Sequence, residues 1–565
     1  MNKHMRFMKH TLAAIAALML CSMAQAGNGI TFKWVDTDVR QEKGVQPSEF
    51  LKKAFAFPAW RGEKVNAEAV IWAETDLQEV SVTASDLVCG KSVIPSCAVS
   101  TSFVRYVMGD KLDETQYGQC GRRDSTVWPR YLSADMLDNV VATDIAASMS
   151  QPVWVSVKVP ADAAPGKYRG KITLKGKGIA EMSLPVEIEV QDRLMPEPSE
   201  WGFHLDLWQN PYSVARWHNV RLWSDEHFEY LRPVMQMLAD AGQKVITATV
   251  LDKPWNGQTE DPFGPMITKI KRADGSWLYD YTIFDKWVEF MMGLGIDEQI
   301  NCYSMVPWKM SFDYFDQATN SLASVECTVD SPEFANYWGS FLKDFQEHLR
   351  VKGWLGKTNI AMDERSMEAM LATIALVKSA APEIGIALAG SYHEEIQADI
   401  NDLCITSVEE FPEDIREQRH QDGLVSTYYT CCAEGYPNTF LASVPAEGSW
   451  IGWYALAHNF DGYLRWAFNS WTIDPIRDGR FRTWAGGDCY MVYPEARSSI
   501  RFEKLIEGIR DYEKARIMMA EWEARGEAGE IARFQAALDA FIIPNIPIHG
   551  AAAPVTAARK ILAEK

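Results

Sequence analysis

The sequence is short of positive charge: its 565 residues hold 56 Lys and Arg against 76 Asp and Glu, a formal net charge of −20. So acidic a protein repels phosphate backbones and anionic lipids, which argues against nucleic acid and anionic membranes as partners. No segment beyond the first 26 residues is long and apolar enough to span a bilayer. The length exceeds one ordinary core, so two or three domains are expected.

The sequence also lacks the usual signatures of metal and cofactor sites. Its ten cysteines form no Cys-x-x-Cys pair and no His-rich spacing of the kind that binds zinc. The adjacent Cys431 and Cys432 are interpreted as packing rather than chemistry. We find no Gly-rich phosphate loop, no nucleophile elbow and no repeat at solenoid spacing. The sequence therefore predicts a protein without metal or organic cofactor.

The first 26 residues have the pattern of a secretory signal peptide. Basic residues (Lys3, Arg6 and Lys9) precede the apolar run 11–20, and residues 24–26, Ala-Gln-Ala, fit a cleavage site. Cys21 raises lipidation as an alternative, but the bulky Leu20 before it disfavours that. We expect a protein exported to the periplasm or beyond the cell, mature from about Gly27.

Two halves of the chain have different periodicities. Residues 27–195 contain alternating or β-branched runs, among them VNAEAVIWAE, VWVSVKV, KYRGKITLKG and EMSLPVEIEV, with turn signals between the later ones. This pattern predicts an antiparallel β-sandwich. The Pro-rich segment 195–200 marks a boundary, after which we expect a catalytic domain over 196–510 and a helical segment over 511–565.

The second domain alternates apolar strand segments with amphipathic helix segments. Eight strands are expected at 201–208, 244–251, 298–308, 358–364, 384–392, 402–410, 424–430 and 461–468. Helices are expected near 224–241, 281–293, 332–351, from the end of the strand at 364 up to 380, and near 412–420, 446–458, 498–525 and 530–541. Eight such units predict an α/β fold, a (β/α)8 TIM barrel. The charge-rich stretch 501–525 is expected to be a solvated helix face.

Reactive groups in such barrels lie where the strands end at their carboxyl side. Four Asp-Glu pairs occur, at 113–114, 225–226, 297–298 and 363–364, and of these only Asp363-Glu364 follows a strand. Position therefore selects Asp363 and Glu364 as catalytic candidates. Arg365 is expected to pair with a nearby carboxylate. No second His or carboxylate stands at ligand spacing from His393, so it is interpreted as a hydroxyl donor rather than a metal ligand.

Aromatic, amide and charged residues at the other strand ends predict a pocket for a polyhydroxylated ring. The substrate-binding candidates are Trp208, Asn210, Trp308, Tyr392, His393, Glu410, Tyr428, Tyr429, Arg465, Trp466, Asn469 and Trp471. Several of these, notably Trp466 and one of the two tyrosines, are alternatively core residues below the rim.

Two adjacent carboxylates do not suit an ordinary glycosidase, whose two carboxyl groups stand on opposite sides of the scissile bond. They do suit substrate-assisted hydrolysis, in which the 2-acetamido oxygen of the sugar attacks the anomeric carbon. That reaction needs one acid/base and one carboxylate to hold the acetamido N–H. A conventional retaining mechanism with Glu410 as nucleophile stays open as an alternative.

Several motifs resemble those of glycoside hydrolase family 123. They are the strand-end MDE, LDLWQNPYSVARW, CYSMVPW, YYTCCAEGYPNTF, GWYALAHNFDGYLRWAFNSWTIDP, YPEARSSIRFEKLIEGIRDYEKAR and, in the sandwich, WRGEKVNAEAVIWAETDL. The resemblance covers nearly the whole mature chain. It implies an exported β-N-acetylgalactosaminidase with a sandwich and a catalytic barrel, acting on terminal β-linked GalNAc of glycans or glycolipids with retention.

By this resemblance Glu364 is the acid/base, and Asp363 orients and polarises the acetamido group. One of the tyrosines at 428 and 429 would bond the acetamido carbonyl, and Trp308, Trp466 and Trp471 would wall the methyl group or ring. Two rival functions stay open: a conventional glycosidase acting on a sugar without an acetamido group, and a glycan-binding protein without catalysis.

Overall fold

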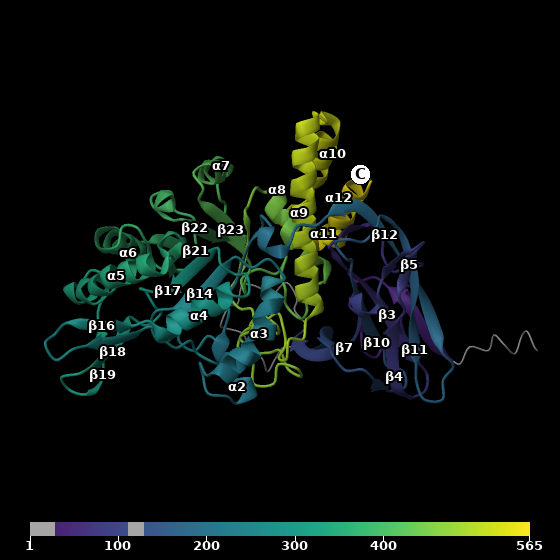
Figure 1. The fold of residues 1–565 in the computed structure, drawn as a ribbon, viewed down its shortest axis with the longest axis horizontal. Helices are drawn as coiled ribbons and strands as arrows, with labels where there is room; N and C mark the ends of the chain where they lie inside the picture. The colour runs from purple at the N-terminus through teal and green to yellow at the C-terminus, as the bar shows by residue number, and fades with distance from the viewer. Residues whose placement is uncertain (1–28, 111–128, 565) are drawn as a thin grey trace, which may run out of the picture.

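The computed structural model describes residues 29–110 and 129–564. Figure 1 shows a β-sandwich on the right, an α/β barrel on the left and the long helix α9 between them. The predicted signal peptide, Cys21 and the pair at 113–114 lie outside the described residues. No helix within the described ranges is both long and apolar enough to cross a membrane.

The sandwich is built from two sheets. The first has five strands in the order β1 (Ile30–Val35), β3 (Lys64–Ala73), β10 (Gln151–Lys158), β7 (Val99–Asp110), β8 (Arg130–Asp138). The second has the order β2 (Ala59–Arg61), β12 (Met182–Leu194), β11 (Gly166–Lys175), β4 (Leu77–Ala84), β9 (Thr143–Ile145), extended by β5 (Leu87–Cys89) and β6 (Ser92–Ile94). All pairs are antiparallel except β2 with β12, so the predicted antiparallel sandwich is confirmed.

The second domain is the predicted eight-stranded parallel barrel. Its strands follow the order β13 (His204–Leu207), β24 (Gly462–Arg465), β23 (Val425–Tyr429), β22 (Asp402–Thr406), β21 (Gly385–Gly390), β20 (Thr358–Met362), β17 (Gln299–Tyr303), β14 (Val245–Thr249). Each lies inside one of the eight segments expected from the sequence.

Two glutamine side chains complete the seam where β13 meets β14. Gln243 accepts a hydrogen bond from the Leu207 amide at 3.0 Å and donates to the Val245 carbonyl at 2.7 Å. Gln209 accepts from the Thr247 amide at 2.8 Å. The backbones meet here in a single parallel bridge, Leu205 with Gln243. Because buried amides and carbonyls must be paired, the two side chains extend this short pairing and nearly close the barrel.

Helices cover the outside of the barrel. They are α2 (Pro211–His218), α3 (Asp225–Ala239), α4 (Thr282–Met292), α5 (Pro332–Lys352), α6 (Met367–Ala380), α7 (Glu413–Gln421) and α8 (Ala446–Ala457). Ser224 and Ser331 accept bonds from amides in the first turns of α3 and α5. Helix α2 was not predicted. Neither was the four-stranded sheet of β16 (Trp277–Asp280), β15 (Thr268–Lys271), β18 (Ser311–Asp316) and β19 (Ser321–Glu326).

The prediction that residues 501–525 form a solvated helix face is wrong, because many charged residues of helix α9 (Ile500–Arg525) are buried. Glu503, Lys504 and Glu513 are each at most 3 % exposed. The helix lies between the two domains, where Ile500 packs with Trp154 of β10. Its charges pair across this interface, for example Glu503 with Lys64. Helix α9 runs without a break across position 510, where the catalytic domain was expected to end. After it the chain forms α10 (Ala528–Leu538), α11 (Ile546–His549) and α12 (Ala552–Ala563).

Candidate active site

The alternation of side chains along β20 aims Asp363 into the barrel mouth. Ala361 faces the barrel interior, together with Ala387 of β21 and Cys404 of β22, whereas Met362 packs outward against the helices. Asp363 follows Met362 and has the same parity as Ala361. Small alanines on two adjacent strands leave room above them. Ser366 then caps α6 by accepting from the Ala369 amide, which fixes where the chain turns.

The Asp363 carboxylate accepts three hydrogen bonds, two from a guanidinium group and one from an indole. Arg365 donates through Nε to Oδ1 and through Nη2 to Oδ2, both at 2.9 Å. Trp308, from the loop after β17, donates its indole N–H to Oδ2 at 2.8 Å. These three donors fix the plane of the carboxylate. The predicted pairing of Arg365 with a carboxylate is thus confirmed, and the partner is Asp363 itself.

Glu364 is exposed at the mouth and has one hydrogen bond from the protein. Tyr429, at the end of β23, donates its hydroxyl to Glu364 Oε1. Burial raises the pKa of the Tyr429 phenol far above its usual value, and the charge of Glu364 adds to this. The phenol therefore stays protonated and acts as a donor. Within the described chain, Oε2 of Glu364 makes no hydrogen bond.

An aromatic cluster forms the wall beside these carboxylates. The Trp208 ring stacks on Trp255 with centroids 4.8 Å apart, and Tyr303 contacts both. Trp208, Trp255 and Trp466 line a narrow cleft. The loops after β14 and β17 are joined by a bond from the Trp308 amide to the Pro254 carbonyl at 2.9 Å. Of the predicted aromatics, the structure therefore brings Trp208, Trp308, Tyr429 and Trp466 to this mouth.

Three predicted rim residues lie at the other side of the mouth, near the ends of β21 and β22. Tyr392 packs on Phe411 with ring centroids 5.0 Å apart, and Glu409 accepts from its backbone amide. His393 is half-buried and Glu410 is exposed. Strand β22 ends at Thr406, so Glu410 lies in the following loop rather than at the strand end.

Other predicted site residues turn out to support the fold. Tyr428 is fully buried on the outer face of β23, where its hydroxyl donates to the Ile451 carbonyl of α8 at 2.8 Å. Trp471 is likewise in the core and donates to the Val492 carbonyl. The structure brings neither side chain to the mouth. Their interpretation as core residues, the alternative open from the sequence, describes them better.

The amides Asn210 and Asn469 tie the end of β13 to the chain after β24. Asn210 caps α2 through its side-chain oxygen, and Asn469 both accepts from its amide and donates to its carbonyl. Both are fully buried. Arg465 is buried too, and forms an ion pair with Asp488 at 2.7 Å and a bond with Asn438. These three residues position the surrounding loops and do not reach the mouth.

A polar layer fills the barrel below the mouth. Gln299 and Asn301 donate to Asp402 Oδ2 at 2.7 and 3.2 Å. Burial raises the pKa of Asp206 well above its usual value, and the nearby Asp402 adds a smaller effect in the same direction. The neutral acid is therefore favoured. Among the described residues no group of three or more His, Cys, Asp or Glu is arranged to hold a metal ion.

The residues missed from the sequence are Trp255 and Tyr303, which build the aromatic wall with Trp208. Trp255 lies in the Pro- and Gly-containing loop 251–263 directly after β14. A tryptophan in a loop at the carboxyl end of a barrel strand was the signal that could have found it.

The two adjacent cysteines, both interpreted as packing from the sequence, differ in the structure. Cys432 is disulfide-bonded, whereas Cys431 is a free thiol.

Two family models match the chain. The model of the glycoside hydrolase 123 catalytic domain matches residues 208–518, and that of the glycoside hydrolase 123 N-terminal domain matches residues 34–176. A search of curated proteins finds no match.

Among solved structures, the chain is similar to a family 123 glycoside hydrolase from Clostridium perfringens, described for the hydrolysis of glycolipid glycans. The two share 26 % identity with a TM-score of 0.84, over 94 % of this chain and 97 % of the other. A family 5 xyloglucanase from Bacteroides ovatus matches at 7 % identity and a TM-score of 0.30, over 80 % of this chain and 97 % of its own.

The catalytic-domain match alone covers more than half of the chain, and it contains Asp363, Glu364, Trp308 and Tyr429. The similar family 123 structure extends over both domains. The chain belongs to glycoside hydrolase family 123 and is a glycosidase.

Proposed function

We propose that the protein is a retaining β-N-acetylgalactosaminidase that works by substrate assistance. The observation that carries the proposal is that two adjacent carboxylates at the end of β20 differ in burial and in the number of hydrogen bonds that hold them. Asp363 is buried and held by three donated bonds, while Glu364 is exposed and held through one oxygen. A fixed anion beside an accessible acid is what an acetamido sugar needs to cleave its own glycosidic bond.

The open acceptor positions suggest how the sugar is held. A carboxylate offers about four acceptor positions; within the described chain Oδ2 of Asp363 accepts two bonds and Oδ1 one. We assign the acetamido N–H to Oδ1. The acetamido oxygen attacks C1, and the proton on Glu364 passes from Oε2 to the departing glycosidic oxygen. Water, deprotonated by Glu364, then opens the oxazolinium ion at C1, so two inversions give net retention.

Three further parts of the proposal rest on similarity or on the leader sequence. GalNAc, rather than its epimer GlcNAc, is assigned because of the resemblance to family 123, and glycolipid glycans because the similar Clostridium perfringens enzyme is described for them. The basic and apolar leader of residues 1–26 supports export to the periplasm or beyond the cell.

The experiment is a turnover panel of aryl β-glycosides of GalNAc, GlcNAc and galactose. We expect hydrolysis of aryl β-GalNAc, none of aryl β-galactoside, and strong inhibition by a GalNAc-derived thiazoline that mimics the cyclised intermediate. Hydrolysis of the galactoside without thiazoline inhibition would instead support a conventional mechanism. Binding of GalNAc without any hydrolysis, or unchanged turnover in Glu364→Gln, would refute the assignment of Glu364 as the acid.

A further inference from the structure

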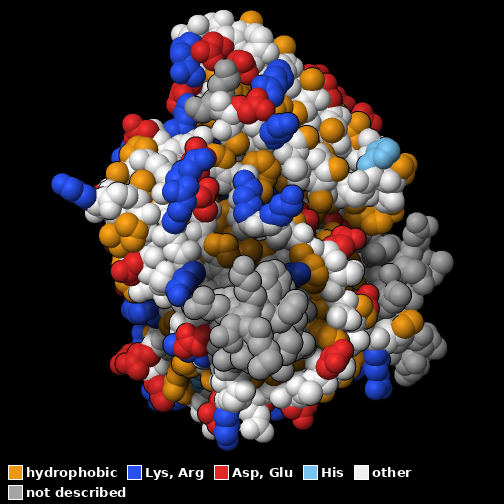
Figure 2. All heavy atoms as spheres, turned by 90° about the vertical axis from the view of Figure 1, so that its right-hand side faces the viewer, with side chains coloured by type: hydrophobic (Ala, Val, Ile, Leu, Met, Phe, Trp, Pro, Cys, Tyr) orange, Lys and Arg blue, Asp and Glu red, His pale blue; other side chains and the backbone are white. Residues whose placement is uncertain are grey.

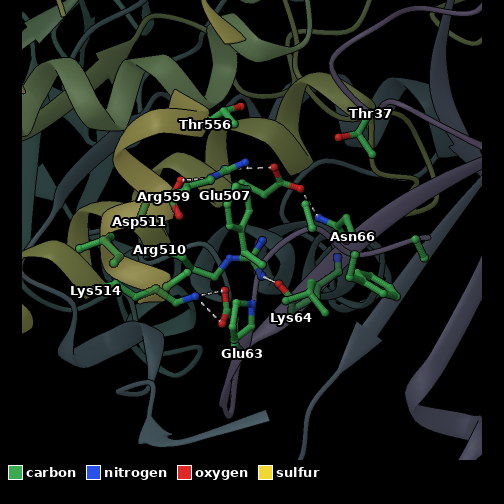
Figure 3. A pocket seen from close by; sticks show the side chains of 18 of the residues that line it. Thr37, Glu63, Lys64, Asn66, Glu507, Arg510, Asp511, Lys514, Thr556 and Arg559 are labelled. Carbon is green, nitrogen blue, oxygen red and sulfur yellow. Dashed lines mark hydrogen bonds and ion pairs between the residues drawn. The ribbon is translucent and has the colours of Figure 1, made fainter. Parts of the chain in front are cut away.

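Buried charges at the interface between the two domains are paired with one another. A cavity of about 300 Å³ lies there, between the sandwich and helices α9 and α12 (Figure 3). Figure 2 shows the sandwich side of the molecule, where Lys and Arg side chains lie beside Asp and Glu side chains. Among the pairs that line the cavity, Lys514 contacts Glu63 at 2.6 Å and Arg559 contacts Asp511 at 2.7 Å. These pairs join the two domains, and the proposed glycosidase reaction uses none of them.

Another buried ion pair, between Arg465 and Asp488, lies at the end of β24 and contacts the barrel mouth through a tryptophan. Arg465 donates through Nη2 to Oδ1 of Asp488 at 2.7 Å, and both side chains are fully buried. The same oxygen accepts the indole N–H of Trp466 at 3.2 Å. Trp466 directly follows β24 and lines the narrow cleft with Trp208 and Trp255. Asp488 therefore holds a residue of the mouth, although its own side chain is closed to solvent.

The backbone around Asp488 is fixed on both sides of the residue. Before it, the Gly487 carbonyl accepts a bond from the buried Arg501 at 2.9 Å. After it, the Met491 amide donates to the Phe468 carbonyl at 2.8 Å, which ties the segment to the chain that follows β24. A carboxylate on so restrained a segment also restrains the group that donates to it.

The orientation of the Trp466 ring depends on this bond. Trp466 is half-buried, and its indole has a single N–H donor, so the acceptor of that N–H sets how the ring lies. Bonds to the carboxylate of an ion pair are stronger than bonds between neutral groups. Trp308 is held in the same way, since its indole N–H donates to Asp363. Two tryptophans of the mouth are thus each oriented by a carboxylate.

We propose that Asp488 is a positioning residue of the glycosidase site, which fixes the Trp466 indole so that one face of the ring contacts the bound sugar. Arg465 in turn holds Asp488. The inference rests on the proposed function in that the mouth must bind a glycoside. A ring face contacts the sugar both before and during the reaction, so loss of its orientation should raise KM more than it lowers kcat.

The test replaces both partners of the ion pair together, because removing one of them would leave the other charge buried alone. Arg465→Met/Asp488→Asn keeps an acceptor oxygen for the Trp466 indole, whereas Arg465→Met/Asp488→Leu removes it. Each double variant is also made together with Trp466→Phe, which removes the N–H donor. Trp471→Phe is the matched control, because it removes an indole bond in the core, to the Val492 carbonyl. Each variant is assayed for kcat and KM on whichever aryl glycoside the wild type hydrolyses, at equal folded fraction.

We expect KM to be roughly fivefold or more higher in the Asp488→Leu double variant than in the Asp488→Asn double variant, with kcat within about twofold. This difference should vanish when Trp466→Phe is added to both, and Trp471→Phe should keep the KM of the wild type. Equal KM in the two double variants, a difference that persists alongside Trp466→Phe, or a change confined to kcat would overturn the proposal.

A measurement on the wild type serves if the double variants do not fold. In protein labelled with ¹⁵N-tryptophan, the indole signal that disappears in Trp466→Phe belongs to Trp466. We expect this N–H to exchange with solvent at least tenfold more slowly than that of free tryptophan, and its signal to shift when N-acetylgalactosamine is added. Exchange as fast as in free tryptophan would refute the bond to Asp488. Failure of the proposed function is distinguishable, because the wild type would then hydrolyse no aryl glycoside while the Trp466 indole stayed protected.

Discussion

Two neighbouring tyrosines on β23 allow a matched test of the site, because their hydroxyls serve different purposes on opposite faces of the strand. Tyr429 points into the barrel and donates to Glu364, whereas Tyr428 points outward and donates to the Ile451 carbonyl. Replacing either one by Phe removes a single oxygen and keeps the ring. We expect Tyr429→Phe to reduce catalysis and Tyr428→Phe to reduce stability.

The magnitudes follow from the partners. A hydrogen bond to a charged group contributes about 1.5–3 kcal/mol, or roughly 10- to 150-fold in rate if it is lost from the transition state. Because Glu364 is exposed and water can replace part of the bond, we expect the lower end, a loss of about tenfold in kcat/KM for Tyr429→Phe. The Tyr428 bond is neutral, so Tyr428→Phe should cost about 0.5–1.5 kcal/mol of unfolding free energy.

The assay combines initial rates on an aryl β-GalNAc substrate with urea unfolding of both variants and the wild type. A change of less than threefold in kcat/KM for Tyr429→Phe would contradict a role in positioning Glu364. A loss of turnover in Tyr428→Phe as large as that in Tyr429→Phe, at equal folded fraction, would show that the inward and outward assignments are mistaken.

Three other changes test the site, the barrel seam and the sandwich. Asp363→Asn keeps the shape but removes the charge that faces the developing cation, so we expect kcat to fall roughly 100-fold or more with KM within a few-fold; a change in KM alone would oppose this role. Gln243→Ala leaves the Leu207 amide unpaired at the seam and removes one of the two donors to the Val245 carbonyl, the other being Gln209, which should cost about 1–3 kcal/mol in urea unfolding; the exposed Gln236→Ala is its control. Burial raises the pKa of Glu68 to about 8. The folded protein therefore binds this proton more tightly than the unfolded chain, and stability should fall as the pH rises from about 4.5 to about 8. Unfolding at pH 5 and pH 8 should show a smaller loss in Glu68→Gln than in wild type, and an equal loss would oppose the assignment.

The barrel could be predicted because its strand segments are buried on both faces and mostly apolar, and because helical segments separate most of them. That same two-sided burial hid which face of each strand points inward. The sequence placed Tyr428 and Tyr429 together at a strand end, and only the packing of Tyr428 against α8 separates them. Strand periodicity alone orders neighbours on one strand but does not say which of them faces the barrel axis.

The sequence suggested that the side-chain amides of Asn210 and Asn469 bind substrate, and the structure places them elsewhere for a different reason. Asn210 and Asn469 follow strands, where a polar side chain could equally bind a substrate or pair a backbone group. The sequence did contain a discriminating signal for Asn210, since Pro211 follows it and the Asn-Pro order is typical of a helix cap and first turn. Asn469 offered no such signal, because its partner lies 259 positions away in the chain.

Helix α9 shows the limit set by distance along the chain. Lys504 pairs with Asp38, and Lys514 pairs with Glu63, so the charges of this helix are neutralised by a domain more than 400 residues earlier. A charged helix that is solvated and one that is wedged between domains have the same local pattern. A cavity lined by residues of both domains, among them Lys64 and Arg510, exists only because the two domains meet there, so no local motif could have indicated it.

The different restraint of Asp363 and Glu364 suits the different steps that the proposed mechanism assigns to each. In that mechanism Asp363 faces the developing cation, so bonds from Arg365 and Trp308 that fix it before the sugar arrives save reorganisation when the cation forms. In the same mechanism Glu364 gives a proton to the leaving group and then takes one from water, at positions that are not identical. A side chain anchored through one oxygen to Tyr429 and otherwise open to solvent can serve both steps. Adding a second anchor to Glu364 should therefore slow hydrolysis of the intermediate more than its formation, which single-turnover kinetics on an activated aryl substrate would separate.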